Sequence, residues 1–332
     1  MVASRPAWDN IESVMLPRPR GALSTWLVDL LRTDPLQADP ASTPPPASDG
    51  RDDDAISLWI LQELHYRGFD EVDDRWEWQP TTIGVRLQLE TALEQRLRGR
   101  YAAADVPRTE DLVADLQDLV AADSGPSLAR HVQKDGSRAE TDTLLRQRSV
   151  YHLKEADPTS WVVPRLSAKP KAALLEVQFD EYGNGDPAKL HHVMFERGLV
   201  ASGLSADYGA YVDEAITEIL EQNNALSMFG LQRRLRGAAL GHLAAFEATS
   251  SIPSRQLAQG LRRLDFPDEM AAYYDEHVEA DAVHEQLALR DVCLVLAQEE
   301  PDLADDVRFG AWACLDLEGQ TAAAVIDLWA AA

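Results

Sequence analysis

The sequence predicts an all-α protein, specifically a bundle of helices. Apolar residues recur every three or four positions in segments such as 55–69 and 81–101, which is the period of an amphipathic helix. Alternating strand-like patterns are almost absent, and the chain contains no internal repeat. The lengths of the helical segments suit a bundle that surrounds one core.

The helical pattern follows an N-terminal stretch of different composition. Residues 33–54 are rich in Pro, Asp and Ser and nearly free of large apolar side chains, so we expect a loop or a disordered linker there. This predicts an N-terminal extension over residues 1–54 and a single helical domain over residues 55–332. A second polar break, at residues 134–142, separates the first helices of that domain from the rest.

The remaining helical segments cover residues 172–182, 211–248, 270–298 and 321–331. Two of their boundaries carry specific signals. Asp186 followed by Pro187 predicts a helix N-cap with proline at the first helical position. The run from Ser250 to Pro253 predicts that another helix ends there.

The charge balance limits the classes of partner. The chain has 31 basic and 56 acidic residues, for a formal net charge of −25, which disfavours binding to nucleic acids and to anionic membranes. No apolar run approaches the roughly 20 residues that a membrane span needs. The N-terminal residues lack the order of a signal peptide, and Cys293 and Cys314 have the context of buried thiols. We therefore expect a cytoplasmic protein.

The segment YYDEHVEADAVHEQL (273–287) is the first candidate for a functional site. It places His277, Asp281 and His284 at positions i, i+4 and i+7, within about 60° of one another on a helix. Imidazole and carboxylate ligands together suit zinc, iron or manganese. For this segment alone, a solvated helix face with the same residues is the favoured interpretation over a metal site.

Further candidate ligands lie elsewhere in helical segments. Glu247 is a carboxylate on an otherwise apolar face, where burial is costly unless the group is paired or ligated. Glu181 ends one helix and His191 begins the next after a glycine-containing turn, so one site could use both. Competing candidates at this turn are Glu176, Asp180 and His192. Glu155, which precedes a proline-limited loop, could equally be a surface acid.

A ferritin-like di-iron bundle does not fit this pattern. That architecture requires Glu-x-x-His pairs on two separate helices. Among the eight histidines of the chain, only His284 follows an acidic residue, Asp281, by three positions.

The segments that contain these candidates resemble the heme-oxygenase-like di-iron oxidases and oxygenases, a family described broadly as iron-containing redox enzymes. The resemblance rests on Glu155 followed by EYGNGDPAKLH, FEATSSIP and HVEADAVH, in this order and spacing. ELHYRGF (63–69) and DRWEW (74–78) are similar to the N-terminal helices of the family. The resemblance extends over residues 55–330 and rests on the combination of motifs.

The resemblance implies a heme-oxygenase-like fold that binds two irons, cycling between Fe(II) and Fe(III), and no heme. The implied iron ligands are Glu155, Glu181, His191, Glu247, His277, Asp281 and His284. The four carboxylates of this set would also be the catalytic residues. Glu155 matches an additional carboxylate of the members that oxygenate amine nitrogens, which places the chain in the N-oxygenase-like branch.

On this basis we expect an oxygenase that uses O2 to oxidise the nitrogen of a small amine or amino acid in a biosynthetic pathway. An external electron donor would be a partner, and the resemblance is compatible with a homodimer. The alternatives are oxidative C–C cleavage or desaturation of an amino or fatty acid, and a non-catalytic helical interaction protein. A heme-degrading enzyme with His65 as the proximal ligand is disfavoured by the acidity of the chain.

The other histidines and the aromatic residues are assigned structural roles. His131, His152 and His242 have no convergent partners by spacing, and His65 is expected to be a packed or hydrogen-bonded residue of a helix. Tyr273 and its aromatic neighbours are expected to form core and pocket walls.

Overall fold

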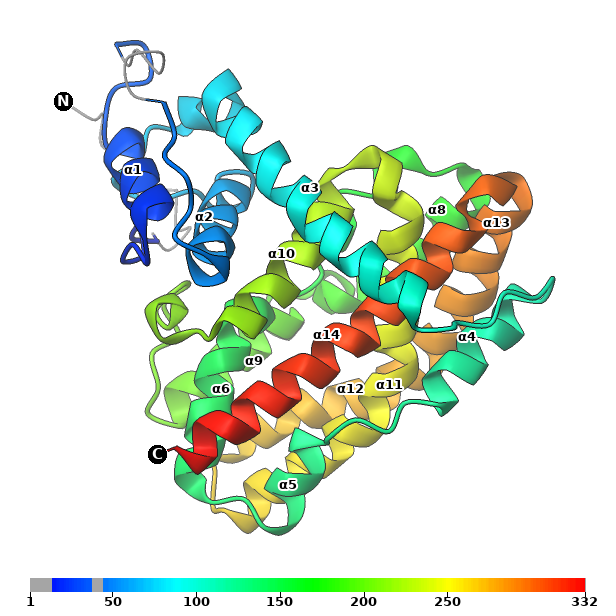
Figure 1. The fold of residues 1–332 in the computed structure, drawn as a ribbon. Coiled ribbons are helices and arrows are strands. Elements are labelled where there is room, and N and C mark those ends of the chain that lie inside the picture. Colours follow the sequence, from blue (N-terminus) through cyan, green and yellow to red (C-terminus); the bar gives the residue numbers. More distant parts are fainter. Residues whose placement is uncertain (1–13, 38–43, 332) are drawn as a thin grey trace.

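The structure is a computed structural model that describes residues 14–37 and 44–331, with the backbone alone for residues 279–283. Within these residues it contains helices and no strand, so the all-α prediction is confirmed (Figure 1). The α-helices are α1 (Ala22–Leu31), α2 (Arg51–Glu63), α3 (Pro80–Ala103), α4 (Leu112–Ala121), α5 (Leu128–Lys134), α6 (Arg138–His152), α7 (Asp157–Ser160), α8 (Ala168–Glu181), α9 (His191–Ala201), α10 (Thr217–Leu231), α11 (Arg236–Arg263), α12 (Asp268–Gln286), α13 (Val295–Glu299) and α14 (Ala304–Ala330). A π-helical segment, Leu287–Leu294, joins α12 to α13.

The N-terminal helices α1 and α2 pack against each other at one end of the molecule (Figure 1). Helix α2 begins at Arg51, so the last four residues of the predicted linker are helical, and that part of the prediction is wrong. The reason is Asp53, whose carboxylate accepts hydrogen bonds from the backbone N–H groups of Leu23 and Ser24 at 3.0 and 2.8 Å. These contacts tie the start of α1 to α2. Residues 38–43 of the predicted linker lie outside the described part of the chain.

Helix α11 packs against both α12 and α14, and these helices form the centre of the bundle (Figure 1). Glycine allows the close approach of α11 and α14. Gly241 of α11 lies against the backbone carbonyl of Val307, and Gly310 of α14 lies against that of Ala238. A side chain at either position would overlap the opposite backbone.

Two clusters of buried apolar residues form the core, and α12 passes from one to the other. Met270 and Tyr273, near its start, belong to the first cluster. Leu289 and Val292, in the following π-helical segment, belong to the second. The part of α12 that carries the candidate histidines therefore lies where the two clusters meet.

Helix α11 does not end at Ser250–Pro253, so that predicted boundary is wrong. It continues through Pro253, which has no N–H group to donate to the carbonyl of Thr249. Beyond the proline, Leu257 and Leu261 are buried in the first cluster. We infer that this burial outweighs the cost of about 3 kcal/mol for an internal proline.

Two other boundaries agree better with the sequence. The carboxylate of Asp186 accepts a hydrogen bond from the N–H of Ala188, so the predicted N-cap before Pro187 is confirmed. The polar break expected at 134–142 is shorter, because α6 already begins at Arg138. Ser137 and Glu140 form a capping box at that end.

None of the described helices combines the length and apolar character that crossing a bilayer requires.

Candidate metal centre

The fold gathers acidic and histidine side chains from five segments into two adjoining groups. The first group comprises Glu155, Glu181, His191 and His277, and the second comprises Glu181, Glu247 and His284. Within each group, one potential ligand atom of every residue lies within 4.8 Å of the others. Asp281 belongs to α12, but its side chain lies outside the described residues, and its predicted role stays a prediction.

Each of these residues holds a defined position in the fold. Glu181 is the last residue of α8 and His191 is the first of α9, so the short turn between them brings the two side chains together. Glu155 lies in the turn between α6 and α7. Glu247 is on α11, and the two histidines of α12 face the same region.

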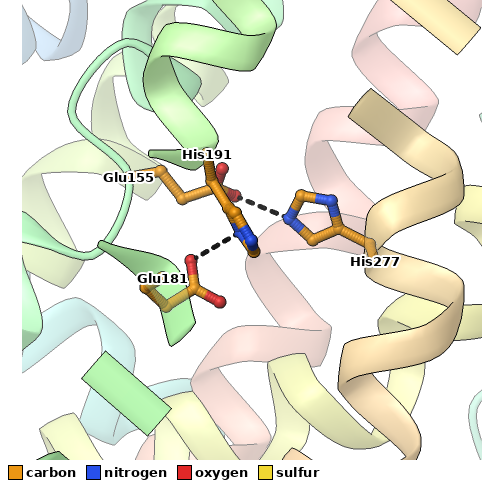
Figure 2. Close-up of side chains that lie close together, drawn as sticks. All are labelled: Glu155, Glu181, His191 and His277. Carbon is orange, nitrogen blue, oxygen red and sulfur yellow. Dashed lines mark ion pairs between the residues drawn. The ribbon is translucent and has the colours of Figure 1, made fainter. Parts of the chain in front are cut away.

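In the first group the side chains converge from three helices and from the turn that contains Glu155 (Figure 2). Oε2 of Glu181 lies 3.0 Å from Nδ1 of His191, and Oε1 of Glu155 lies 3.6 Å from Nε2 of His277. All four side chains are buried or nearly so, with residue exposures between 3% and 9%. Nδ1 of His191 makes this short contact with Glu181 without a hydrogen bond.

In the second group Nδ1 of His284 faces two carboxylates. It lies 3.4 Å from Oε2 of Glu247 and 3.9 Å from Oε1 of Glu181, again without a hydrogen bond. Glu181 therefore presents one oxygen to each group.

The outer ring nitrogens of the two α12 histidines are held by other groups. Nδ1 of His277 lies 2.9 Å from the carbonyl oxygen of Tyr273, which can only accept, so this nitrogen carries the proton. Nε2 of His284 bonds to Oδ2 of Asp180 at 3.0 Å. Carbonyl and carboxylate partners of this kind fix the tautomer and orientation of metal-binding histidines. Asp180, a competing ligand candidate in the sequence, thus contacts a histidine on its outer side.

Glu155 is positioned by groups that the sequence did not single out. The hydroxyl of Tyr273 donates to Oε2 of Glu155 at 2.7 Å, and Nδ1 of His152 lies 3.4 Å from Oε1. The next residue, Ala156, has φ = 71°, a left-handed conformation that costs a non-glycine residue about 1 kcal/mol. His152, to which the sequence analysis assigned a structural role only, therefore also contacts a candidate ligand. The signal in the sequence that could have indicated this contact is its position three residues before Glu155.

Electrostatics explain why the site suits a cation. Burial lowers the pKa of His284, but Glu247 and Asp180 outweigh burial and raise it to about 9. Burial likewise opposes protonation of His191, yet Glu181 raises its pKa. Burial alone would raise the pKa of Glu155, but His277 and His152 hold it well below its usual range. The carboxylates thus favour positive charge at this site, which a divalent metal ion would supply.

The donor set fits iron. Carboxylates and imidazoles are ligands of iron, manganese and zinc. The buried ring nitrogens of His191 and His284 face carboxylates without hydrogen-bonding to them. A cavity of about 560 Å³ reaches the site, and its lining includes Glu155, Glu247 and His277.

The remaining candidates lie apart from both groups. His65 lies in the turn after α2, 3.1 Å from Glu77 and in contact with Arg86, so its expected packed and hydrogen-bonded role is confirmed, although it is not within the helix. Glu176 is exposed, and His192 lines a separate surface cleft. Cys293 and Cys314 are buried free thiols, as expected.

Comparison with known families agrees with this geometry. The model of a family described as iron-containing redox enzyme matches residues 142–319, more than half of the chain. All six described residues of the two groups fall within the matched range, and the match agrees with the heme-oxygenase-like fold that the sequence implies. No curated protein matches the chain.

Proposed function

The chain belongs to the family of iron-containing redox enzymes, and on this premise we propose that it is a non-heme di-iron oxygenase. The observation that carries the proposal is the membership of Glu181 in both groups of candidate ligands. One of its oxygens faces His191 and the other faces His284. A carboxylate in this position can bridge two metal ions.

The proposed ligands divide between two irons. Glu155, His191 and His277 would hold one iron, Glu247 and His284 would hold the other, and Glu181 would lie between them. Asp281 is a further proposed ligand, on the basis of its place between the two histidines of α12. Two irons bound in this way would supply the redox chemistry that activates O2.

The residues around the site would prepare it for this chemistry. Tyr273 and Asp180 hold the histidines of α12 in orientation through their outer ring nitrogens. The buried side chains keep bulk water from the ligands, which strengthens their electrostatic interactions. Tyr273 and His152 hold Glu155 toward the first group.

We propose N-oxygenation of an amine or amino acid as the reaction. An amine N–H becomes N–OH, with one oxygen atom taken from O2. The other oxygen atom leaves as water, and an external donor provides the two electrons that accompany two protons. The buried position of Glu155 within the first group supports this choice. The sequence resemblance implies that this residue corresponds to the additional carboxylate of the members that oxygenate amine nitrogens.

Iron stoichiometry tests the metal centre. After anaerobic loading with Fe(II), we expect about two irons per chain from the two ligand groups. Glu181→Ala should lose most of both, because the bridging carboxylate serves both irons. Glu176→Ala is the matched control, since Glu176 is exposed on the same helix. A chain that binds no iron would instead favour a non-catalytic interaction protein.

Product analysis tests the reaction. The loaded protein is supplied with O2, a reductant and a panel of amines and amino acids, and the products are identified by mass spectrometry. Hydroxylamine or nitro products support N-oxygenation, whereas alkenes or aldehydes support the alternative of desaturation or C–C cleavage. If Glu155→Ala leaves iron stoichiometry and turnover unchanged, Glu155 has no part in the site.

A further inference from the structure

The cavity beside the candidate metal centre has an uneven charge distribution. Its lining includes the acidic residues Asp123, Glu285 and Glu318 in addition to the candidate ligands. Arg148 is the sole arginine, and no lysine occurs, among the described residues that line it. Among the described residues, Arg148 is therefore the one arginine or lysine that an anionic group in this cavity would meet.

Arg148 lies where the cavity meets a smaller side pocket of about 60 Å³. Both are lined by Arg148, and also by His152, Phe246 and Glu318. Arg148 is on α6, one helical turn before His152, whose Nδ1 lies 3.4 Å from Oε1 of Glu155. The guanidinium is therefore close to the first ligand group without belonging to it.

The contacts of the Arg148 guanidinium are long. Its Nη1 lies 3.5 Å from Nε2 of His152, and its Nη2 lies 3.6 Å from Oε1 of Glu318. The hydroxyl of Tyr274 is a further polar neighbour: burial raises the pKa of Tyr274 to about 12, and Arg148 opposes this shift. Arg51, in contrast, lies 2.6 Å from Glu221 and 2.8 Å from Glu218.

Glu318 is itself engaged elsewhere, because its Oε2 accepts a hydrogen bond from Gln222 at 2.8 Å. A guanidinium has five N–H donors in a planar fork that matches a carboxylate. The side chain of Arg148 is 22% exposed, and the residue lines the cavity.

The side pocket beyond Arg148 has mainly apolar walls, formed by Leu128, Leu144, Tyr151, Ile219, Leu226 and Phe246. His242 and Asn223 also line it, and each has one buried side-chain atom without a hydrogen-bond partner, Nε2 of His242 and Oδ1 of Asn223. Such a pocket fits a small apolar group, and it favours one that carries a hydrogen-bonding atom.

We propose that Arg148 binds the carboxylate of the substrate, so that the substrate is an amino acid or another amine with a carboxylate, and that the side pocket takes its apolar portion. This rests on the proposed function, because the amine nitrogen is directed toward the ligand groups. A bidentate guanidinium–carboxylate pair provides both affinity and orientation.

Binding measurements on matched pairs of compounds test the proposal. The L-amino acids of proteins and the amines that lack their carboxylates are titrated by calorimetry into the full-length chain. The chain is used both metal-free and loaded with iron without O2. We expect at least one amino acid to bind about 10- to 100-fold more tightly than its amine. Arg148→Gln should abolish this difference.

Arg146→Gln is the matched control. Arg146 is on the same helix but pairs with Glu214 at 3.3 Å and lies outside the cavity lining. The proposal is overturned if no amino acid binds better than its amine, or if Arg148→Gln binds amino acids as well as the unmodified chain does.

Glu318→Gln separates substrate binding from a purely structural role. If Arg148 only ties α6 to α14 through Glu318, both variants lower the melting temperature alike and neither changes the preference for the carboxylate. Under the proposal, Glu318→Gln keeps or strengthens carboxylate binding, because it removes a competing acid. Carboxylate-dependent binding without iron uptake would refute the di-iron function alone. Iron uptake without that dependence would refute the Arg148 proposal alone.

Discussion

The Tyr273 hydroxyl determines the direction in which the Glu155 carboxylate faces. It donates a hydrogen bond to Oε2 at 2.7 Å, and the other oxygen, Oε1, faces His277 and His152. The backbone carbonyl of the same tyrosine fixes the ring of His277. One residue thus orients two members of the first ligand group.

Tyr273→Phe should weaken the first metal position while leaving the backbone carbonyl in place. The lost hydrogen bond to a charged group contributes about 1.5–3 kcal/mol. We expect at least a tenfold loss of affinity for one of two metal ions, which a Mn²⁺ titration followed by electron paramagnetic resonance would measure. Tyr274→Phe is the matched control, since its hydroxyl faces Arg148 and makes no hydrogen bond to a described candidate ligand. Equal effects of the two variants would contradict this role.

The ligand candidates were more predictable than the residues that position them. His277 and His284 share a helix, so their common face follows from helical geometry, and the turn around Gly183 indicates that Glu181 and His191 are close. Glu155 lies in a turn in which the next residue, Ala156, has a left-handed conformation. Alanine, unlike glycine or asparagine, gives no local signal for that conformation.

At the scale of elements, the contact between α11 and α14 sets the position of Glu247. Gly241 lies six residues before Glu247 and directly against the carbonyl of Val307. The spacing between these helices is therefore limited by the backbone itself.

Gly241→Ala should force α11 and α14 apart. We expect a loss of about 1–3 kcal/mol in the free energy of unfolding, measured by urea denaturation, together with weaker iron binding through Glu247. Gly99→Ala is the control, because Gly99 lies inside α3 with no neighbouring heavy atom within 4 Å of an added Cβ. That change should stabilise the protein by about 0.5–1 kcal/mol. A stable Gly241→Ala variant would show that the two helices can separate at little cost.

The elements that the sequence missed are those set by distant contacts. The period of apolar residues indicated most helices of the bundle, but it gave no sign that α11 continues past Pro253 or that α2 begins at Arg51. Both depend on groups from elsewhere: the buried residues after the proline pack into the core, and Asp53 binds the start of α1. The amino-acid composition around Pro253 or Arg51 carries no information about these contacts with distant residues.

At the scale of the whole molecule, burial lowers the pKa of several histidines. The clearest is His242, on α11 beside Phe229, where burial lowers the pKa to about 4. The pKa values of His65 and His192 are also lowered to about 4, in each case by burial and then by a nearby arginine. These residues make the folded state harder to protonate than the unfolded chain.

The protein should therefore lose stability as the pH falls from about 6.5 to 4, the unfolded and folded pKa values of these histidines. In that range the unfolded chain binds protons that the folded state does not, so the free energy of unfolding decreases by up to about 1.4 kcal/mol per pH unit for each histidine. Above pH 6.5 both states are neutral at these positions and the effect vanishes. His242→Leu should reduce the slope of the free energy of unfolding against pH by up to one proton, measured by urea denaturation in the metal-free chain.

Phe229→Leu provides the comparison, because it perturbs the same packing without removing a titrating group. It should lower stability by a similar amount at every pH and keep the slope of the unmodified chain, since the loss of apolar contacts does not depend on protonation. The two variants separate packing from proton linkage at one place in α11. If His242→Leu keeps the original slope, His242 takes up a proton in the folded state, and burial in the side pocket does not exclude charge.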